Sequence, residues 1–263
     1  MIKVKNLTKQ FGDRIVLDNI TTSFKEGAVN MIIGRSGSGK TVFLKCLIGL
    51  IQPTNGEIFF EGKDIIKMRS KDIKRLRRDM GMMFQGSALF DSRTVLENVM
   101  FPLDIFSRKN KRERRKRAEF CLERVNLSHA ADLYPSEISG GMMKRVAIAR
   151  AIALNPKYLF CDEPNSGLDP KTSQLIDELI ADITSDLGIT SIVVSHDMNS
   201  VMNIGDEIIF LNEGFLEWTG TKDDIMDTDN DKLNEFVFAS DLFKKIKEAD
   251  ASLSISESEK ESQ

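Results

Sequence analysis

The sequence predicts an α/β fold built around a mostly parallel β-sheet. Short, mainly apolar runs of strand length occur at 29–33, 158–161 and 190–195. Stretches with the apolar spacing of helices lie between and around them, at 42–48 and 171–186. Apolar strands that alternate with helices are typical of a parallel sheet that helices cover on both faces.

The remaining elements can be placed in order along the chain. Residues 1–26 alternate between apolar and polar side chains, which predicts short antiparallel strands in an N-terminal β subdomain. Further strands are expected at 57–60 and 81–84, a short basic helix at 72–79, and a hairpin joining 207–212 to 215–219 about Glu213-Gly214. The stretch 94–154 is helical throughout, which predicts an α-helical subdomain inserted into the sheet.

These elements predict one domain over residues 1–240. Its core lobe would comprise 1–86 and 155–240, and its helical subdomain 87–154. The last part, 241–263, is expected to be the end of a helix followed by a disordered tail, because it is rich in Ser and Glu and poor in large apolar residues.

The composition indicates a chain that folds in water. Hydrophobic residues make up 41% and charged residues 29%, and the net charge of −3 argues against general attraction to nucleic acid. No apolar run approaches the roughly 18 residues that span a bilayer, and no signal-peptide pattern opens the chain. Cys46, Cys121 and Cys161 are scattered, which favours small buried side chains in a reducing compartment. We expect a cytoplasmic protein that reaches any membrane through a partner.

A glycine-rich segment from Gly34 to Thr41 fits the pattern G-x-x-x-x-G-K-[ST]. It lies between a predicted strand and a predicted helix, so backbone N–H groups and the helix N-terminus would face a phosphate. Lys40 would add positive charge at the β- and γ-phosphates, and the Thr41 hydroxyl can ligate Mg²⁺. The segment therefore predicts an ATP–Mg²⁺ site.

Two carboxylates, Asp162 and Glu163, follow the buried strand at 158–161. Ligands of parallel sheets usually bind at this end of the strands. Asp162 is placed to hold Mg²⁺ through a water, and Glu163 is placed to orient or deprotonate an attacking water. An ordinary acidic turn is the alternative, and the phosphate loop together with the stiff turn at 164–170 argues against it.

A second glycine-rich segment, Ser139-Gly140-Gly141, precedes a helix expected at 142–154. The serine hydroxyl and the free N–H groups at a helix start can bind another phosphate. One nucleotide needs one cradle, so a second one suggests that two chains close on the same nucleotide.

Taken in order, these motifs resemble those of the ATP-binding subunit of an ABC transporter, a P-loop NTPase with a RecA-like core. The likeness covers about residues 2–220. It includes Gln85 as the Q-loop glutamine, Ile138–Met142 as the signature, Ser166–Asp169 as the D-loop, and His196 as the switch histidine. Such an ordered set is highly specific, whereas any one motif alone is not.

The resemblance implies a role for each matching residue. Catalytic roles fall to Lys40, Gln85, Glu163 and His196. Contacts to ATP fall to Phe11, which would stack on adenine, and to Gly34, Arg35, Ser36, Gly37, Ser38, Gly39, Lys40, Thr41, Val42, Ser139, Gly140, Gly141 and Asp169. The Mg²⁺ ligands would be Thr41, Gln85 and Asp162.

Several of these residues keep an alternative. Phe11 could be a core aromatic, Gln85 could cap a strand, and a lone histidine such as His196 is more often structural. His129 receives no role. The basic run 108–117 favours a solvated helix face, with a face near anionic headgroups as the second interpretation.

The resemblance also implies partners. Two copies would form a homodimer around two ATP molecules and drive integral-membrane permease subunits from the cytoplasmic face of the inner membrane, with further lipid-carrier or regulatory subunits in the complex. Met142 and the segment 84–103 are similar to the Mla-type (MlaF-like) branch, which transports phospholipid between membranes. The alternatives are an importer of a polar solute such as an amino acid, and a soluble ABC ATPase acting on nucleic acid or ribosomes. The small net charge argues against the last.

Overall fold

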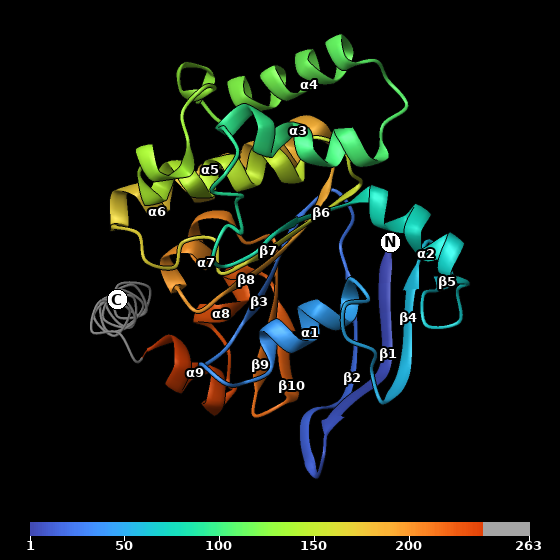
Figure 1. Ribbon diagram of the computed structural model, residues 1–263. Helices are drawn as coiled ribbons and strands as arrows, with labels where there is room; N and C mark the ends of the chain where they lie inside the picture. The colour runs from blue at the N-terminus through green and yellow to red at the C-terminus, as the bar shows by residue number, and fades with distance from the viewer. Residues whose placement is uncertain (239–263) are drawn as a thin grey trace, which may run out of the picture.

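Two β-sheets form the framework of the protein, for which a computed structural model describes residues 1–238 (Figure 1). The larger sheet has the strand order β10-β9-β3-β8-β7-β6, and the smaller one β2-β1-β4-β5. The strands of the larger sheet are β3 (Val29–Ile33), β6 (Met80–Met83), β7 (Tyr158–Asp162), β8 (Thr190–Ser195), β9 (Glu207–Asn212) and β10 (Phe215–Gly220). Those of the smaller sheet are β1 (Ile2–Phe11), β2 (Arg14–Phe24), β4 (Asn55–Phe60) and β5 (Lys63–Asp64).

The larger sheet is parallel except at its edge strand β10, which pairs antiparallel with β9. All residues of β3, β7 and β8 are buried, as expected for strands covered on both faces. The register pairs Ile33 with Ser195 and Asp162 with Val194. The carboxyl ends of β3, β7 and β8 therefore meet at one edge, where the predicted site lies.

The smaller sheet is antiparallel and packs against α1 (Lys40–Leu47), which lies between the two sheets (Figure 1). Side chains from both sheets join those of α1 in one core, as Phe24 does with Phe43 at 6.3 Å between ring centroids. This arrangement confirms the predicted α/β class with an N-terminal antiparallel β subdomain. The burial of aromatic side chains, worth about 1.5–3 kcal/mol each, holds α1 and the loop before it in place.

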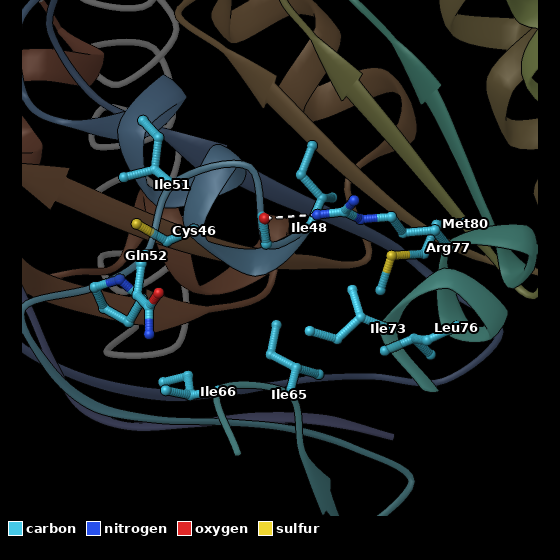
Figure 2. A pocket seen from close by; sticks show the side chains of 12 residues that line it. Cys46, Ile48, Ile51, Gln52, Ile65, Ile66, Ile73, Leu76, Arg77 and Met80 are labelled. Atoms are coloured by element: carbon cyan, nitrogen blue, oxygen red, sulfur yellow. Dashed lines mark hydrogen bonds between the residues drawn. The ribbon is translucent and has the colours of Figure 1, made fainter. Parts of the chain in front are cut away.

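A small apolar cavity of about 90 Å³ lies between the end of α1, the β5 turn and α2 (Ser70–Leu76) (Figure 2). Arg77, in the 3₁₀ turn Arg77–Asp79, donates to the backbone carbonyl of Gly49 at 2.9 Å. Pockets for small ligands measure roughly 300–1,000 Å³. The cavity is therefore too small for a nucleotide.

Three helices between β6 and β7 pack on one another at one end of the larger sheet (Figure 1). They are α3 (Val95–Phe106), α4 (Lys111–Arg124) and α5 (Gly140–Ala151), with 3₁₀ turns at Ser128–Ala130 and Pro135–Glu137. Capping boxes of Thr94 with Glu97 and of Asn110 with Glu113 begin α3 and α4. Most basic side chains of 108–117 are exposed on α4 and the loop before it, as a solvated helix face requires.

The structure corrects the predicted helix after the second glycine segment. It was expected to begin at Met142 and end at Leu154, whereas α5 begins at Gly140 and ends at Ala151. The reason is that the Ser139 hydroxyl accepts the Met142 N–H at 3.3 Å and so caps the helix. Both glycines of the segment thus belong to the first turn.

The C-terminal part contributes elements that the sequence did not reveal. Helix α6 (Pro170–Leu187) was expected, but α7 (Met198–Ile204), α8 (Lys222–Met226) and α9 (Asp231–Val237) were not. All three thiols are buried and free, as expected. Within residues 1–238, no helix combines the length and apolar character needed to cross a bilayer. The interpretation of 241–263 as a helix end and disordered tail lies outside the described residues.

Candidate functional site: a phosphate loop beside two carboxylates

The phosphate loop joins β3 to α1, and its shape requires glycine at two positions. At Gly39, with φ of 98°, a Cβ would lie 2.7 Å from the Leu17 Cδ2 and 2.9 Å from the Val16 oxygen. At Gly34, with φ of 147°, it would lie 2.1 Å from the Leu211 oxygen. Side chains are excluded at both positions, so the backbone can wrap closely at the N-terminus of α1, where an anion is favoured.

Lys40, the first residue of α1, is buried and lies inside the loop. Its Nζ donates to the carbonyls of Gly34 at 2.7 Å and Arg35 at 2.9 Å. Burial lowers the pKa of Lys40, while the nearby charges of Glu163 and Asp162 raise it. The ammonium is thus placed between the loop backbone and the two carboxylates.

Asp162, at the end of β7, accepts a hydrogen bond from the Thr41 hydroxyl at 3.0 Å. Burial raises the pKa of Asp162, and the bond from Thr41 opposes that rise. Within residues 1–238, no three His, Cys, Asp or Glu side chains cluster as a complete metal cage. Two oxygen groups without a cage fit the way Mg²⁺ binds, since it keeps waters and takes phosphate oxygens.

Two other predicted residues, Gln85 and His196, meet at the carboxylate of Glu163. The Gln85 Nε2 donates to its Oε2 at 2.9 Å, and the His196 Nδ1 lies 3.3 Å from its Oε1. The backbone of Glu163 has a φ of 46°, an unfavourable conformation for a non-glycine residue. Such local strain is often found at functional sites.

A hollow of about 300 Å³ lies in front of the phosphate loop. It is lined by Val16, Ser36, Gly37, Gly39, Lys40, Thr41, Val42, Gln85 and Glu163. All of these except Val16 were singled out from the sequence. Val16 was missed because an apolar residue in the first hairpin carries no chemical signal of its own.

Three predicted nucleotide contacts, Phe11, Arg35 and Asp169, lie apart from this hollow. Phe11, at the end of β1, is 47% exposed, which excludes the alternative that it is a core aromatic. Arg35 points away to Glu235 in α9, with 3.5 Å between the charged groups. Asp169 caps α6 by accepting the Thr172 N–H at 3.0 Å.

The second glycine segment lies beside the D-loop, since a Cβ on Gly140 would be 3.9 Å from the Leu168 Cδ2. Ser139 and Gly140 are exposed, and neither lines the hollow before the phosphate loop. A Cβ on Gly141 would lie 2.6 Å from the Thr172 Cγ2 at the start of α6. Within one chain, the structure therefore does not bring the two glycine segments together around a common hollow.

Behind the D-loop lies a buried polar group centred on Asp177 of α6. The Asn165 Nδ2 donates to the Asp177 Oδ1 at 2.7 Å and to the Ser200 Oγ at 2.9 Å. Burial raises the pKa of Asp177 to about 6. Titration of this carboxyl group, which lies beneath the D-loop, should therefore make the stability of the fold depend on pH.

We expect Asp177→Asn to remove that dependence. The pKa of Asp177 is higher in the folded than in the unfolded state. The protonated carboxyl therefore stabilises the fold below about pH 4, and this stabilisation is lost as the pH rises through about 6. As the pH rises from about 4 to about 7, the free energy of unfolding of Asp177→Asn should increase by about 1–3 kcal/mol relative to that of the wild type. Thermal unfolding across this range measures it, with the exposed Asp182→Asn on the same helix as control. A difference between Asp177→Asn and wild type that is independent of pH would contradict the assignment.

A strand, a glycine-rich loop and a helix that begins with lysine, beside a strand that ends in two carboxylates, define a P-loop NTPase. The chain matches the profile of the ABC transporter family over residues 17–166, more than half its length. It belongs to the ABC transporter family.

Relatives of known name agree with this family but differ in cargo. The chain is 39% identical over 237 residues to the intermembrane phospholipid transport system ATP-binding protein MlaF of Haemophilus influenzae, with 90% of each chain covered. It is 38% identical over 258 residues to the methionine import ATP-binding protein MetN of Campylobacter jejuni, with 92% of this chain and 77% of MetN covered.

A solved structure extends the likeness to three dimensions. The dimeric post-hydrolysis structure of the ATP-binding cassette MJ0796, bound to ADP and Pi, matches with a TM-score of 0.77 at 38% identity. The match covers 84% of this chain and 98% of that cassette. The chain is thus the ATP-binding subunit of an ABC transporter and an ATPase.

Proposed function

We propose that Glu163 is the general base of ATP hydrolysis and that Gln85, His196 and Lys40 act with it. The observation that carries this proposal is the convergence of Gln85 and His196 on the Glu163 carboxylate, beside the ammonium of Lys40. A base must lie within hydrogen-bond reach of the proton that it takes. Gln85 and His196 hold the carboxylate at the hollow, and Lys40 supplies charge for the phosphates.

The same hollow supports a nucleotide with Mg²⁺. Thr41, Asp162 and Gln85 would hold the ion, which supplies charge neutralisation at the phosphates when bound. The backbone of the loop at Gly34, Arg35, Ser36, Gly37, Ser38, Gly39 and Val42 would surround the phosphates together with the Lys40 ammonium. Phe11 offers an exposed ring on which adenine can stack.

We further propose that two copies share each site. Ser139 and Gly140 are exposed at the start of α5, where a helix N-terminus favours a phosphate, yet Ser139, Gly140 and Gly141 do not line the hollow of their own chain. The D-loop, which ends at Asp169, lies beside this segment and would take part in the same shared site. In a homodimer, the second glycine segment of one chain would close the nucleotide site of its partner. Two ATP molecules would then lie between the two chains.

The permease partner would dock beside Gln85. The segment that follows carries Phe90 and Phe106, which are 38% and 42% exposed, and Phe84 just before Gln85 is 36% exposed. Large exposed apolar side chains within one segment support a protein interface. The subunit would thus lie at the cytoplasmic face of the inner membrane, held there by the permease. In this proposal, a core lobe of 1–86 and 155–240 binds the nucleotide, and a helical subdomain of 87–154 contacts the permease.

Phospholipid is the cargo that we favour, and further lipid-carrier or regulatory subunits would belong to the complex. The support is the likeness of the segment 84–103 to the Mla-type branch and the 39% identity to MlaF. Met142 adds less, because its side chain is partly buried against the core and packing alone explains it. Methionine or another polar solute is the second candidate, favoured by the 38% identity to MetN.

Affinity purification of the full chain in mild detergent tests the cargo. Co-purification of a permease with bound phospholipid is the expected result. Recovery of an amino-acid permease without phospholipid would overturn the phospholipid assignment. The dimer and the catalytic roles would not be affected by that outcome.

A further inference from the structure

Two cationic side chains of α5 hold the backbone of the segment after β6. The Lys144 Nζ donates to the backbone carbonyl of Gln85. The Arg150 guanidinium donates to the carbonyls of Ser87 at 2.6 Å and Ala88 at 2.7 Å. One helix therefore satisfies three carbonyls within four consecutive residues. Charged donors make hydrogen bonds roughly twice as strong as neutral ones.

The segment that they hold is unfavourable by itself. Ser87 and Ala88 both have positive φ, at 60° and 50°, although neither is glycine. Two such residues in succession persist only where the surrounding structure fixes them. The local bonds from the Ser87 N–H to Phe84 and from the Ala88 N–H to Gly86 are short-range. Lys144 and Arg150 supply the long-range restraint.

Burying the ammonium of Lys144 costs free energy, and packing alone would favour an apolar side chain at this position. It is 6% exposed, and burial lowers its pKa, while Glu163 is the first of the charges that oppose this. Desolvating an ammonium costs free energy unless its donors are satisfied. The hydrogen bond to the Gln85 carbonyl offsets part of this cost.

The other end of α5 is the second glycine segment. Ser139 caps the helix, and Lys144 lies five residues further along the same rigid element. Gln85 in turn donates from its side chain to Glu163 at 2.9 Å. Helix α5 and two hydrogen bonds thus connect Ser139 to Glu163: the helix joins Ser139 to Lys144, and the bonds run from Lys144 to Gln85 and from Gln85 to Glu163.

We propose that Lys144 is a positioning residue, which ties the start of α5 to Gln85 so that the placement of the signature segment sets the placement of the Glu163 carboxylate. Arg150 holds the rest of the same segment in the required backbone conformation. The proposal rests on the role of general base proposed for Glu163 and does not depend on the cargo.

The test compares Lys144→Met with Arg145→Met in the full-length chain. Arg145 is on the same helix and donates to the Val125 carbonyl at 3.2 Å, away from Gln85, so it controls for the loss of one anchoring bond. Misplacement of a catalytic group by about 1 Å can cost up to about 100-fold. We expect Lys144→Met to lower kcat about tenfold or more with the KM for ATP within about twofold, and Arg145→Met to keep kcat.

Amide hydrogen exchange of residues 84–90 separates the two explanations. A general loss of stability would accelerate exchange throughout the fold, whereas loss of the bond to Gln85 should accelerate it only in this segment. In Lys144→Met it should accelerate there, and Lys144→Arg, which keeps a charged donor, should restore protection and most of kcat. Unchanged exchange at 84–90, or an equal fall of kcat in Arg145→Met, would overturn the proposal. If Lys144→Met does not fold, Lys144→Gln, which shortens the side chain and removes its charge, provides the same test: kcat must fall and exchange at 84–90 must rise.

Discussion

We expect Glu163→Gln to lower ATP turnover by a factor of about 10² or more while ATP still binds. The amide has nearly the shape of the carboxylate but cannot take a proton from water. The loop that holds the phosphates is formed by other residues, from Gly34 to Thr41, so binding should survive. Turnover and equilibrium nucleotide binding, measured on the same preparation, check both halves of the result.

Glu123→Gln is the matched control, because it makes the same change on the exposed surface of α4. It should leave turnover at the wild-type value. If Glu163→Gln hydrolyses ATP at a near-normal rate, Glu163 is not the base. A loss of binding in Glu163→Gln would instead show that its charge acts on the nucleotide-free loop through Lys40.

Ser139→Arg should also reduce turnover by about 10², although Ser139 does not line the hollow of its own chain. The substitution places a long side chain at the start of α5 and removes the hydroxyl that caps it. Under a shared site, it blocks the approach of this segment to the partner's nucleotide. Binding of ATP to the isolated chain should remain, since the phosphate loop is intact.

The nearby Ser136→Arg tests whether bulk and charge alone cause the loss. Ser136 is exposed in the 3₁₀ turn Pro135–Glu137, three residues before Ser139. We expect near-normal turnover there. Equal damage by both substitutions would mean that this surface tolerates no arginine, and the special role of Ser139 would fall.

The sequence was most informative where chemistry and periodicity coincide. Strand β8 begins and ends at the residues predicted for it, because its centre, Ile192–Val194, is a short β-branched apolar run of the kind found in buried parallel strands. The phosphate loop and the pair Asp162-Glu163 were found because glycines and carboxylates at strand ends are unusual and chemically interpretable. Parallel register then brings them together without further information.

The features that the sequence concealed depend on tertiary context. Val16 lines the hollow only because the β1–β2 hairpin folds over the phosphate loop. Lys144 is one of many lysines, and its bond to Gln85 becomes visible only when α5 lies against the end of β6. The two-residue strand β5 is too short to show an alternating pattern. Ser139 capped its helix two residues earlier than periodicity indicated.

Sharing of the site between two chains is the central claim, and mixing two inactive variants tests it most directly. Ser139→Arg keeps Lys40, and Lys40→Ala keeps Ser139, so a mixed dimer contains one intact composite site. Because a two-fold dimer has two equivalent sites and half the dimers are mixed, we expect about a quarter of wild-type turnover to return. If the mixture stays as inactive as its two parents, the site is not shared in this way.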